Sequence, residues 1–183
     1  MYFKTIDVNI EDLYHEFGGM VYNIALQYVQ NKEDAEEITQ DVFYSIYLNL
    51  DKYRSEANIK TWVYRITINR SLDFIKARNR KKRFAVINSI FTFGNEVNNF
   101  EAAHFNHPGV LMEQKEAVKA IFAGINQLPE NQKTALILNK IEAMSQKEIA
   151  EIMQLSTKAV ESLIQRAKSK LKNILMLNEG NFK

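Results

Sequence analysis

The chain has 183 residues, and because only six are glycine and two are proline, we expect an all-α protein rather than a turn-rich β structure. The lack of cysteine excludes disulfides, thiol catalysis and cysteine-based zinc sites, and with no apolar stretch of about 18 residues and no signal peptide we expect a cytoplasmic protein without membrane insertion. The net charge is only +2, yet residues 76–83 (KARNRKKR) carry six basic and no acidic residues, which favours a nucleic-acid partner.

Two amphipathic helices are expected in the first fifty residues. The first carries an apolar stripe at spacings of three and four: Ile10, Leu13, Tyr14, Phe17, Val21, Ile24 and Tyr28. The second, from about residue 33 to 50, has the clearest core face of the chain: Ala35, Ile38, Val42, Phe43, Ile46 and Leu50. Beside that face lie four acidic or amide side chains, which by themselves indicate only a solvated surface: Asp34, Glu37, Gln40 and Asp41.

A third helix is expected from residue 58 or 59 to about 80. Its apolar residues fall on opposite sides, so periodicity leaves open which of Trp62, Tyr64 and Arg65 points outward. Residues 84–110 keep no helical stripe and contain the helix-hostile sequence HPG, which predicts a linker. The chain is therefore divided into two small helical domains, residues 1–83 and 111–183, joined by a flexible linker at 84–110.

The second domain is predicted to hold helices at 111–126 and after Pro129, which suits a first helical position, followed by a helix-turn-helix at 145–171. Ser145 and Glu148 have the spacing of a capping box, and Ser156 is well suited to cap the second helix. The turn position after Met153 suits a glycine at positive φ, yet it holds Gln154, at a cost of roughly 1 kcal/mol.

The second helix of this unit packs Val160, Ile164, Ala167 and Leu171 inward. Six side chains then point away from the core as a candidate DNA-reading surface: Thr157, Lys158, Glu161, Ser162, Gln165 and Arg166. Two short amphipathic helices with a tight turn also occur in proteins that never touch DNA, so these residues alone leave DNA binding and simple packing equally open.

Three segments in this order resemble bacterial RNA polymerase sigma factors of the extracytoplasmic-function (ECF) group of the sigma-70 family: DAEEITQDVF (34–43), TWVYRITINRSLDFIKARNRKK (61–82) and LPENQKTALILNKIEAMSQKEIAEIMQLSTKAVESLIQRAKSKL (128–171). They correspond to region 2.2, regions 2.3 to 2.4, and region 4 of that family. The resemblance spans about residues 9–177. It implies a bacterial sigma factor that binds core RNA polymerase, recognises promoters and helps to melt DNA at the start of transcription.

The resemblance implies roles for the acidic stripe and for the third helix. In the family the region 2.2 helix docks on the β′ clamp, which makes Asp34, Glu37, Gln40 and Asp41 candidate polymerase contacts, and the β flap is a further implied contact. Minus-ten binding is implied for a flipped-base loop at Ser55, Glu56, Ala57 and Asn58, for Lys60, Trp62, Tyr64 and Arg65, and for the phosphate-binding cations Arg78, Arg80, Lys81, Lys82 and Arg83. Burial of Trp62 in the core is an equally good interpretation of that ring.

Minus-thirty-five binding is implied for the outward residues of the helix-turn-helix, with Lys158, Arg166, Lys168 and Lys170 on phosphates and Glu161, Ser162 and Gln165 near base edges. Positions 161 and 163 are often basic in the family, whereas this chain has Glu161 and Leu163. Direct guanine reading from these two positions is therefore not expected, and Glu161 is suited to accept from cytosine N4.

No enzyme activity, metal or cofactor is expected, because His104 and His107 make at best half a metal site and no phosphate-binding glycine loop is present. Two alternatives stay open. One is a dimeric helix-turn-helix regulator that binds an operator, and the other is a sigma-like decoy for an anti-sigma factor. The leading hypothesis is an ECF sigma factor that is monomeric when free, with core polymerase and promoter DNA as partners and an anti-sigma factor as an open third.

Overall fold

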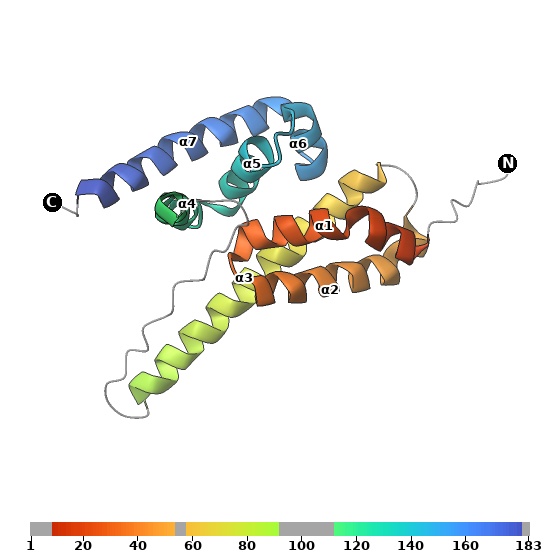
Figure 1. Cartoon of the computed structure of the whole chain (residues 1–183), viewed down its shortest axis with the longest axis horizontal. Helices are drawn as coiled ribbons and strands as arrows, with labels where there is room; N and C mark the ends of the chain where they lie inside the picture. Colours follow the sequence, from red (N-terminus) through yellow and green to blue (C-terminus); the bar gives the residue numbers. More distant parts are fainter. Residues whose placement is uncertain (1–8, 54–57, 92–111, 181–183) are drawn as a thin grey trace. The chain divides into compact units, whose positions relative to one another are not determined.

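The structure, a computed structural model, describes residues 9–53, 58–91 and 112–180 of the chain. Within these ranges the elements are α1 (Ile10–Val29), α2 (Lys32–Asn49), the short 3₁₀ helix η1 (Leu50–Lys52), α3 (Ile59–Phe91), α4 (Met112–Ile125), α5 (Glu130–Lys140), α6 (Gln146–Met153) and α7 (Thr157–Gly180) (Figure 1). The expected all-α class is confirmed. The chain divides into two compact units, Met1–Arg54 with Ile66–His104 and Ser55–Arg65 with Phe105–Lys183.

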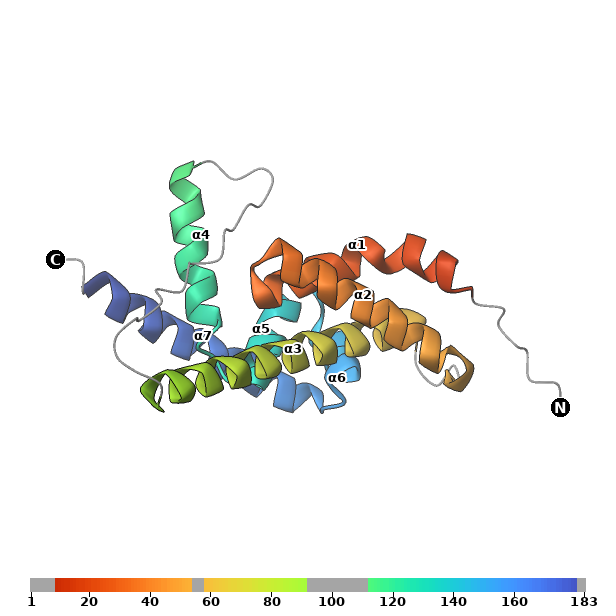
Figure 2. The same cartoon turned by 90° about the horizontal axis from the view of Figure 1, so that it is seen from below.

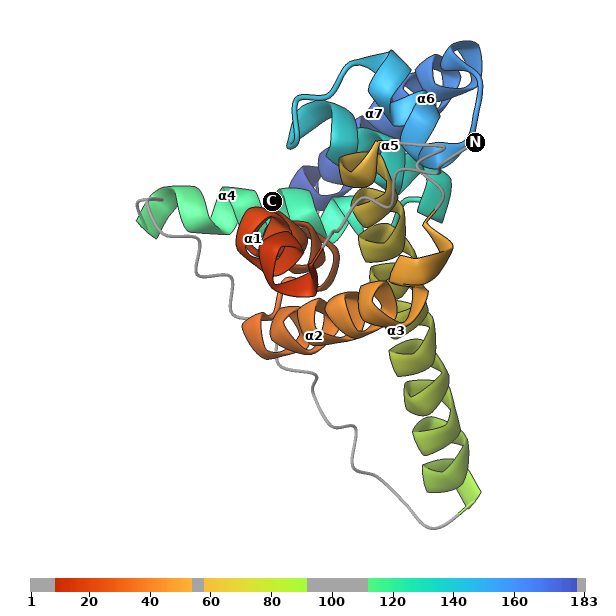
Figure 3. The same ribbon diagram turned by 90° about the vertical axis from the view of Figure 1, so that its right-hand side faces the viewer.

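In the first unit α1 and α2 lie side by side and share an apolar core (Figure 3). Asn9 and Asn31 cap their N-termini through side-chain oxygens that accept from Glu11 N and Asp34 N. The predicted core residues of these two helices are buried, with three exceptions, of which one is the half-buried Ile10 at the start of α1. Tyr14 is 55% exposed, although its ring meets Phe43 edge-on at 4.9 Å, and Leu50 is only half-buried, because the α2 helix ends before it.

Helix α3 is longer than the sequence analysis predicts, since it ends at Phe91 rather than near Arg80. The extra residues include Lys, Arg and Ala, which favour a helix, a short apolar repeat of Phe84, Ile87 and Phe91, and no proline or glycine to stop the helix. The prediction that helical structure ends before residue 84 is therefore wrong, while residues 92–110 of the predicted linker lie outside the described residues. Figure 3 shows the C-terminal half of α3 continuing past the ends of α1 and α2.

The buried face of α3 includes small polar side chains that the apolar pattern did not reveal. Thr67 and Ser71 are fully buried, and the Ser71 hydroxyl donates to the Thr67 carbonyl at 2.8 Å. A hydroxyl that bonds to its own helix can be buried without an unsatisfied donor. Ile66, Leu72 and Ile75, which are among the apolar residues on opposite sides of this helix, are half-buried.

In the second unit α4 crosses the C-terminal half of α7 (Figure 2). Gly124 lies at the crossing, where an added Cβ would stand 2.7 Å from Leu171 Cδ1 and 3.6 Å from Ile174 Cγ2. The absence of a Cβ therefore lets the two helices approach without displacing the end of the Leu171 side chain, which an alanine here would have to move. Helix α5 begins after Pro129, which is the N-cap residue and not the first helical position that was predicted.

The helix-turn-helix forms as predicted from α6 and α7. Ser145 and Glu148 make a complete capping box, and the Ser156 hydroxyl accepts from Ala159 N at 3.2 Å. Gln154 occupies the turn with φ 55° and ψ 43°, so the position that suits a glycine is in the left-handed conformation. Val160, Ile164 and Ala167 of α7 are buried, and Leu171 is half-buried.

We predict that Gln154→Gly stabilises the protein. A non-glycine residue in the left-handed region costs about 1 kcal/mol, which glycine does not incur. Chemical denaturation followed by circular dichroism should show a gain of about 0.5–1 kcal/mol in the free energy of unfolding. Gln154→Ala is the control, because it removes the side chain but keeps the strained backbone. A glycine variant less stable than the alanine variant would contradict the prediction.

Candidate functional site

The predicted reading residues of α7 share one exposed arc of the helix. Thr157, Lys158, Glu161, Gln165 and Arg166 are exposed, Ser162 is half-buried, and Lys168 and Lys170 are exposed further along the same helix. Since the remaining arc is filled by the buried residues that pack on α5 and α6, these side chains are fixed on the outside by the packing of α7 itself. The arc combines cations with groups that can hydrogen-bond to base edges.

The acidic stripe of α2 is exposed at Glu37, Gln40 and Asp41. The same exposed face carries three large apolar side chains that the sequence analysis did not single out: Tyr44, Tyr47 and Leu48, with exposed fractions of 64%, 63% and 54%. Helical spacing from residues 37, 40 and 41 would have found them, because 44, 47 and 48 continue that face by steps of three and four. The outer face of α2 is thus acidic in its first half and apolar in its second.

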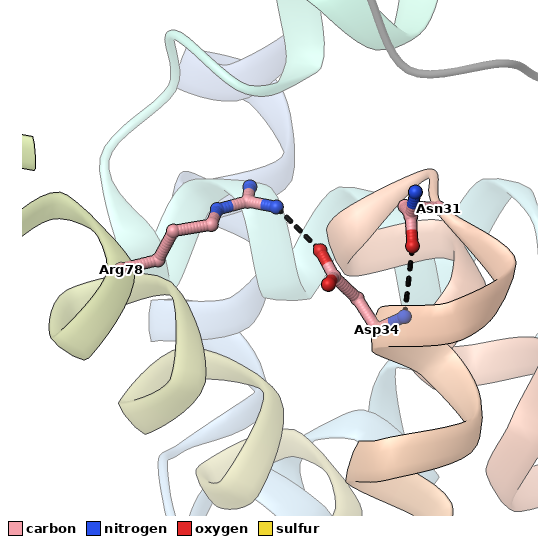
Figure 4. A network of polar contacts seen from close by, with 3 residues as sticks. All are labelled: Asn31, Asp34 and Arg78. Carbon is pink, nitrogen blue, oxygen red and sulfur yellow. Dashed lines mark hydrogen bonds and ion pairs between the residues drawn. The ribbon is translucent and has the colours of Figure 1, made fainter.

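Asp34, the first residue of the acidic stripe, is not free. Its carboxylate forms an ion pair with Arg78 of α3 at 2.7 Å, and its backbone N–H donates to the Asn31 side chain at 2.8 Å (Figure 4). Arg78 was assigned to phosphate binding from its place in the basic block, but in the structure its guanidinium is directed at α2. The ion pair therefore joins one residue from each of two predicted interfaces.

The beginning of α3 belongs to the second unit. There Tyr64 is buried and donates its hydroxyl to the Glu142 carboxylate at 3.2 Å, while Trp62 is half-buried. Burial, followed by the negative charge of Glu142, raises the pKa of the Tyr64 phenol, so this group stays a neutral donor. The question that periodicity left open is answered for Tyr64, whose ring is inside.

Arg65 is half-buried in the same unit, and its guanidinium donates to the carbonyls of Glu151 at 2.6 Å and Ile152 at 3.2 Å. Lys60 is exposed, and Asn58 is exposed with its side-chain oxygen accepting from Lys60 N at 2.9 Å. Ser55, Glu56 and Ala57, the rest of the predicted base-capturing loop, lie outside the described residues.

The basic block continues along α3 after Arg78. Arg80, Lys81 and Arg83 are exposed and Lys82 is half-buried. Arg83 Nε donates to the carbonyl of Asn79 at 3.4 Å, one turn earlier on the same helix. Several cations on one helix segment form the kind of electrostatic surface that follows a phosphate backbone.

The part of the chain that the structure describes contains no candidate metal site and no candidate membrane span. In residues 9–53, 58–91 and 112–180, no group of three or more histidine, aspartate or glutamate side chains is placed to hold a metal ion. His104 and His107, the half site considered above, lie outside these ranges. None of the described helices is long and apolar enough to cross a membrane.

A capped helix-turn-helix with an exposed polar arc, and a separate unit with an acidic helix and a basic helix, define a DNA-binding transcription factor. Two known family descriptions match the chain: "Sigma-70 region 2" over residues 13–81 and "Sigma-70, region 4" over residues 119–171. The RNA polymerase sigma factor SigZ of Bacillus subtilis (strain 168) is 30% identical over 92% of this chain and 88% of its own length. The ECF RNA polymerase sigma-E factor of Escherichia coli (strain K12) is 30% identical over 76% of this chain and 73% of its own.

The chain therefore belongs to the sigma-70 family of RNA polymerase sigma factors, in the ECF group, and it is a promoter-recognition factor of transcription initiation. Its fold is also that of a solved structure, the sigma factor RpoE from Bartonella quintana in complex with the anti-sigma factor NepR. The TM-score is 0.61 at 21% identity, over 91% of this chain and 98% of the other.

We predict that Ser145→Ala raises the pKa of Glu148. Hydrogen bonds from the Ser145 side chain, and then from its backbone N–H, lower this pKa from the ordinary value of 4.5. Because the pKa is lower in the folded protein, ionised Glu148 stabilises the start of α6 at pH values above its ordinary pKa. This contribution to stability is lost as the pH falls through the folded pKa. An NMR titration of the Glu148 carboxyl carbon measures the change.

Ser145→Thr is the control for this titration, because threonine keeps the hydroxyl that bonds to the carboxylate. The threonine variant should titrate like the original chain. If the alanine variant titrates at the same pH as the original, the hydroxyl is not the cause of the shift.

Proposed function

We propose that this sigma factor docks on the β′ clamp of core RNA polymerase through α2, contacts the minus-ten region of promoter DNA through α3, and contacts the minus-thirty-five element through α7. The observation that carries the proposal is the presence, in one chain, of a helix-turn-helix and of a unit that offers both an acidic and a basic helical face. An operator-binding regulator would need the helix-turn-helix but neither the acidic nor the basic helical face. The polymerase performs the chemistry, so the chain itself is not an enzyme, and it acts in the bacterial cytoplasm.

The docking face on α2 combines Glu37, Gln40 and Asp41 with the exposed apolar group Tyr44, Tyr47 and Leu48. Charges at an interface give specificity and raise the association rate, whereas large aromatic side chains that become buried contribute most of the affinity. A basic partner helix with an apolar end fits this face. Asp34 is the weakest candidate of the predicted set, since its carboxylate already faces Arg78.

The DNA-contacting part of α3 is best assigned to Arg80, Lys81, Lys82 and Arg83, with Lys60 and Trp62 nearer the start of the helix. Tyr64 and Arg65 bond to protein groups in the second unit, so they are available to bases only if those bonds open. This division supports phosphate contacts by the basic segment more directly than base stacking by the TWVYR segment.

The upstream element is proposed to meet the exposed arc of α7. Glu161, Ser162 and Gln165 are placed to meet base edges, and Lys158 and Arg166 to hold phosphates. An acidic residue at 161 accepts from cytosine N4, so the preferred upstream sequence is expected to differ from those read by arginine at this position. The proposed division of the chain has domains at 1–83 and 111–183 and a connection at 84–110, whose first residues, 84–91, continue α3.

An anti-sigma factor is proposed as a further partner, because the Bartonella quintana sigma factor of the same fold was solved in complex with one. The β flap of core polymerase is proposed as the contact of the second unit. When free, the chain is proposed to be a monomer.

Transcription with purified core polymerase on a genomic fragment library, with permanganate probing for melted thymines, tests the proposal. Melting that depends on both core polymerase and this chain is the expected result. Binding of the chain to specific duplexes without core polymerase would instead support an operator-binding regulator, and failure to engage DNA at all, with core polymerase present, would support a decoy.

We predict that Asp41→Arg weakens binding to core polymerase, because it places a positive charge in the centre of the acidic half of the docking face. A pull-down or fluorescence titration with core polymerase should show a loss of roughly tenfold or more, the range expected for a like-charge contact. Glu16→Arg on α1 is the matched control, since Glu16 is exposed and its substitution changes the net charge by the same amount. Equal losses in both variants would show only a general effect of charge.

We also predict that replacing Arg80, Lys81 and Lys82 by alanine weakens promoter binding and flattens its salt dependence. Each phosphate contact on duplex DNA contributes about 0.9 to the slope of log K against log salt concentration. The slope should therefore fall by up to about 2.7. An unaltered slope in filter-binding or anisotropy titrations would remove these cations from the DNA interface.

A further inference from the structure

Two polar contacts tie α3 to α2 within the first unit. Arg70 donates to the Ser45 hydroxyl at 3.1 Å, and Arg78 pairs with Asp34 at 2.7 Å. Residue numbers rise along α3 while they fall along α2, so the contacts hold the two helices at two separate levels. The two arginines are about 12 Å apart along the α3 axis, given a rise of 1.5 Å per residue. Two contacts at that separation fix the direction of α3 relative to α2, whereas a single polar contact would let α3 tilt about it.

The Arg78 guanidinium is committed to this contact. Nη1 donates to the Asp34 carboxylate, and Nε is buried without an acceptor among the described residues. The two side chains are 37% and 26% exposed, so the pair is partly withdrawn from water. The side-chain oxygen of Asn31 accepts a hydrogen bond from the backbone N–H of Asp34. This bond keeps the Asp34 carboxylate at a defined place in the first turn of α2 (Figure 4). Release of Arg78 to a phosphate would leave this carboxylate unpaired.

Beyond Arg78, α3 continues to Phe91, about 20 Å further along the axis. Asn79, Arg80, Lys81 and Arg83 are all exposed, so Arg78 is the last side chain before the cations that are available to DNA. If the helix pivoted about its contact at Arg70, a tilt of about 10° would move its end by roughly 5 Å. Such a displacement is enough to misplace phosphate contacts.

We propose that the Asp34–Arg78 ion pair is a positioning device, which fixes the direction of the basic segment of α3 relative to the polymerase-docking face of α2. Arg78 is therefore a positioning residue and not a phosphate contact, and Asp34 is a positioning residue and not a polymerase contact. The inference rests on the proposed function of these two helices, but the geometry itself can be tested without polymerase or promoter.

The first experiment measures the direction of α3 in the free, full-length chain. Because the sequence has no cysteine, Leu48→Cys and Lys81→Cys, both at exposed positions, allow a pair of nitroxide labels to be attached specifically. Pulsed electron paramagnetic resonance should give a narrow distance distribution in the original background. Arg78→Ala and Asp34→Ala should each broaden or shift the distribution by roughly 3 Å, as a tilt of about 10° moves residue 81 less than the end of the helix.

The exchanged pair, Asp34→Arg with Arg78→Asp, should restore the narrow distribution, while Arg80→Ala, a matched loss of charge on the same helix, should leave it unchanged. A distribution that Arg78→Ala does not alter would overturn the proposal. Circular dichroism melting of each variant shows whether the fold is kept; if Arg78→Ala unfolds the unit, restoration by the exchanged pair still decides the question.

The second experiment separates positioning from phosphate contact. Binding to a 30-bp duplex of random sequence is measured across a range of salt concentrations. Arg80→Ala should reduce the salt slope by about 0.9, whereas Arg78→Ala should leave the slope unchanged. Equal reductions would make Arg78 a phosphate contact and overturn the proposal. If Arg80→Ala leaves the slope unchanged, the proposed DNA contact fails, and the distance measurement judges the ion pair by itself.

Discussion

Burial of one apolar arc of α2 against α1 is the interaction on which the first unit depends. Ile38, Val42 and Ile46 are almost completely inaccessible to water, and at roughly 1.5–3 kcal/mol for each such side chain their burial fixes the rotation of the helix about its own axis. Once the rotation is fixed, the residues on the opposite arc must face outward. The acidic and apolar halves of the proposed docking face are thus consequences of core packing, which fixes the backbone positions from which these side chains project.

The helix-turn-helix could be predicted almost completely from sequence because its determinants are local. A capping box spans four residues, and the turn residue Gln154 is flanked by two helices whose apolar positions are regular. The end of α3 could not be predicted in the same way. Its last turns carry only a short apolar repeat, Phe84, Ile87 and Phe91, and a repeat over two turns directly before a segment without one is weaker evidence than the long stripes of α1 and α2.

The candidate site was predictable residue by residue only where exposure follows from helical periodicity. Glu37, Asp41 and the outer arc of α7 met that condition, and Tyr44 and Leu48 would have met it as well. Asp34 and Arg78 did not, because they are 44 positions apart in the sequence and their pairing depends on how α2 and α3 cross. Likewise, no local pattern shows that the Tyr64 hydroxyl meets Glu142, 78 residues away.

Gly124 sets a limit on how the second unit can vary. At the crossing of α4 and α7 a methyl group would meet Leu171 Cδ1, which the leucine side chain can relieve by moving, whereas a large branched side chain would also crowd Ile174 and Leu175. The cost of a substitution at this position should therefore rise with the size of the new side chain. A bulky residue at this position is thus a candidate for a temperature-sensitive allele, in which warming unfolds the second unit, proposed to read the upstream element, while α1 and α2, which fold around a different core, stay intact.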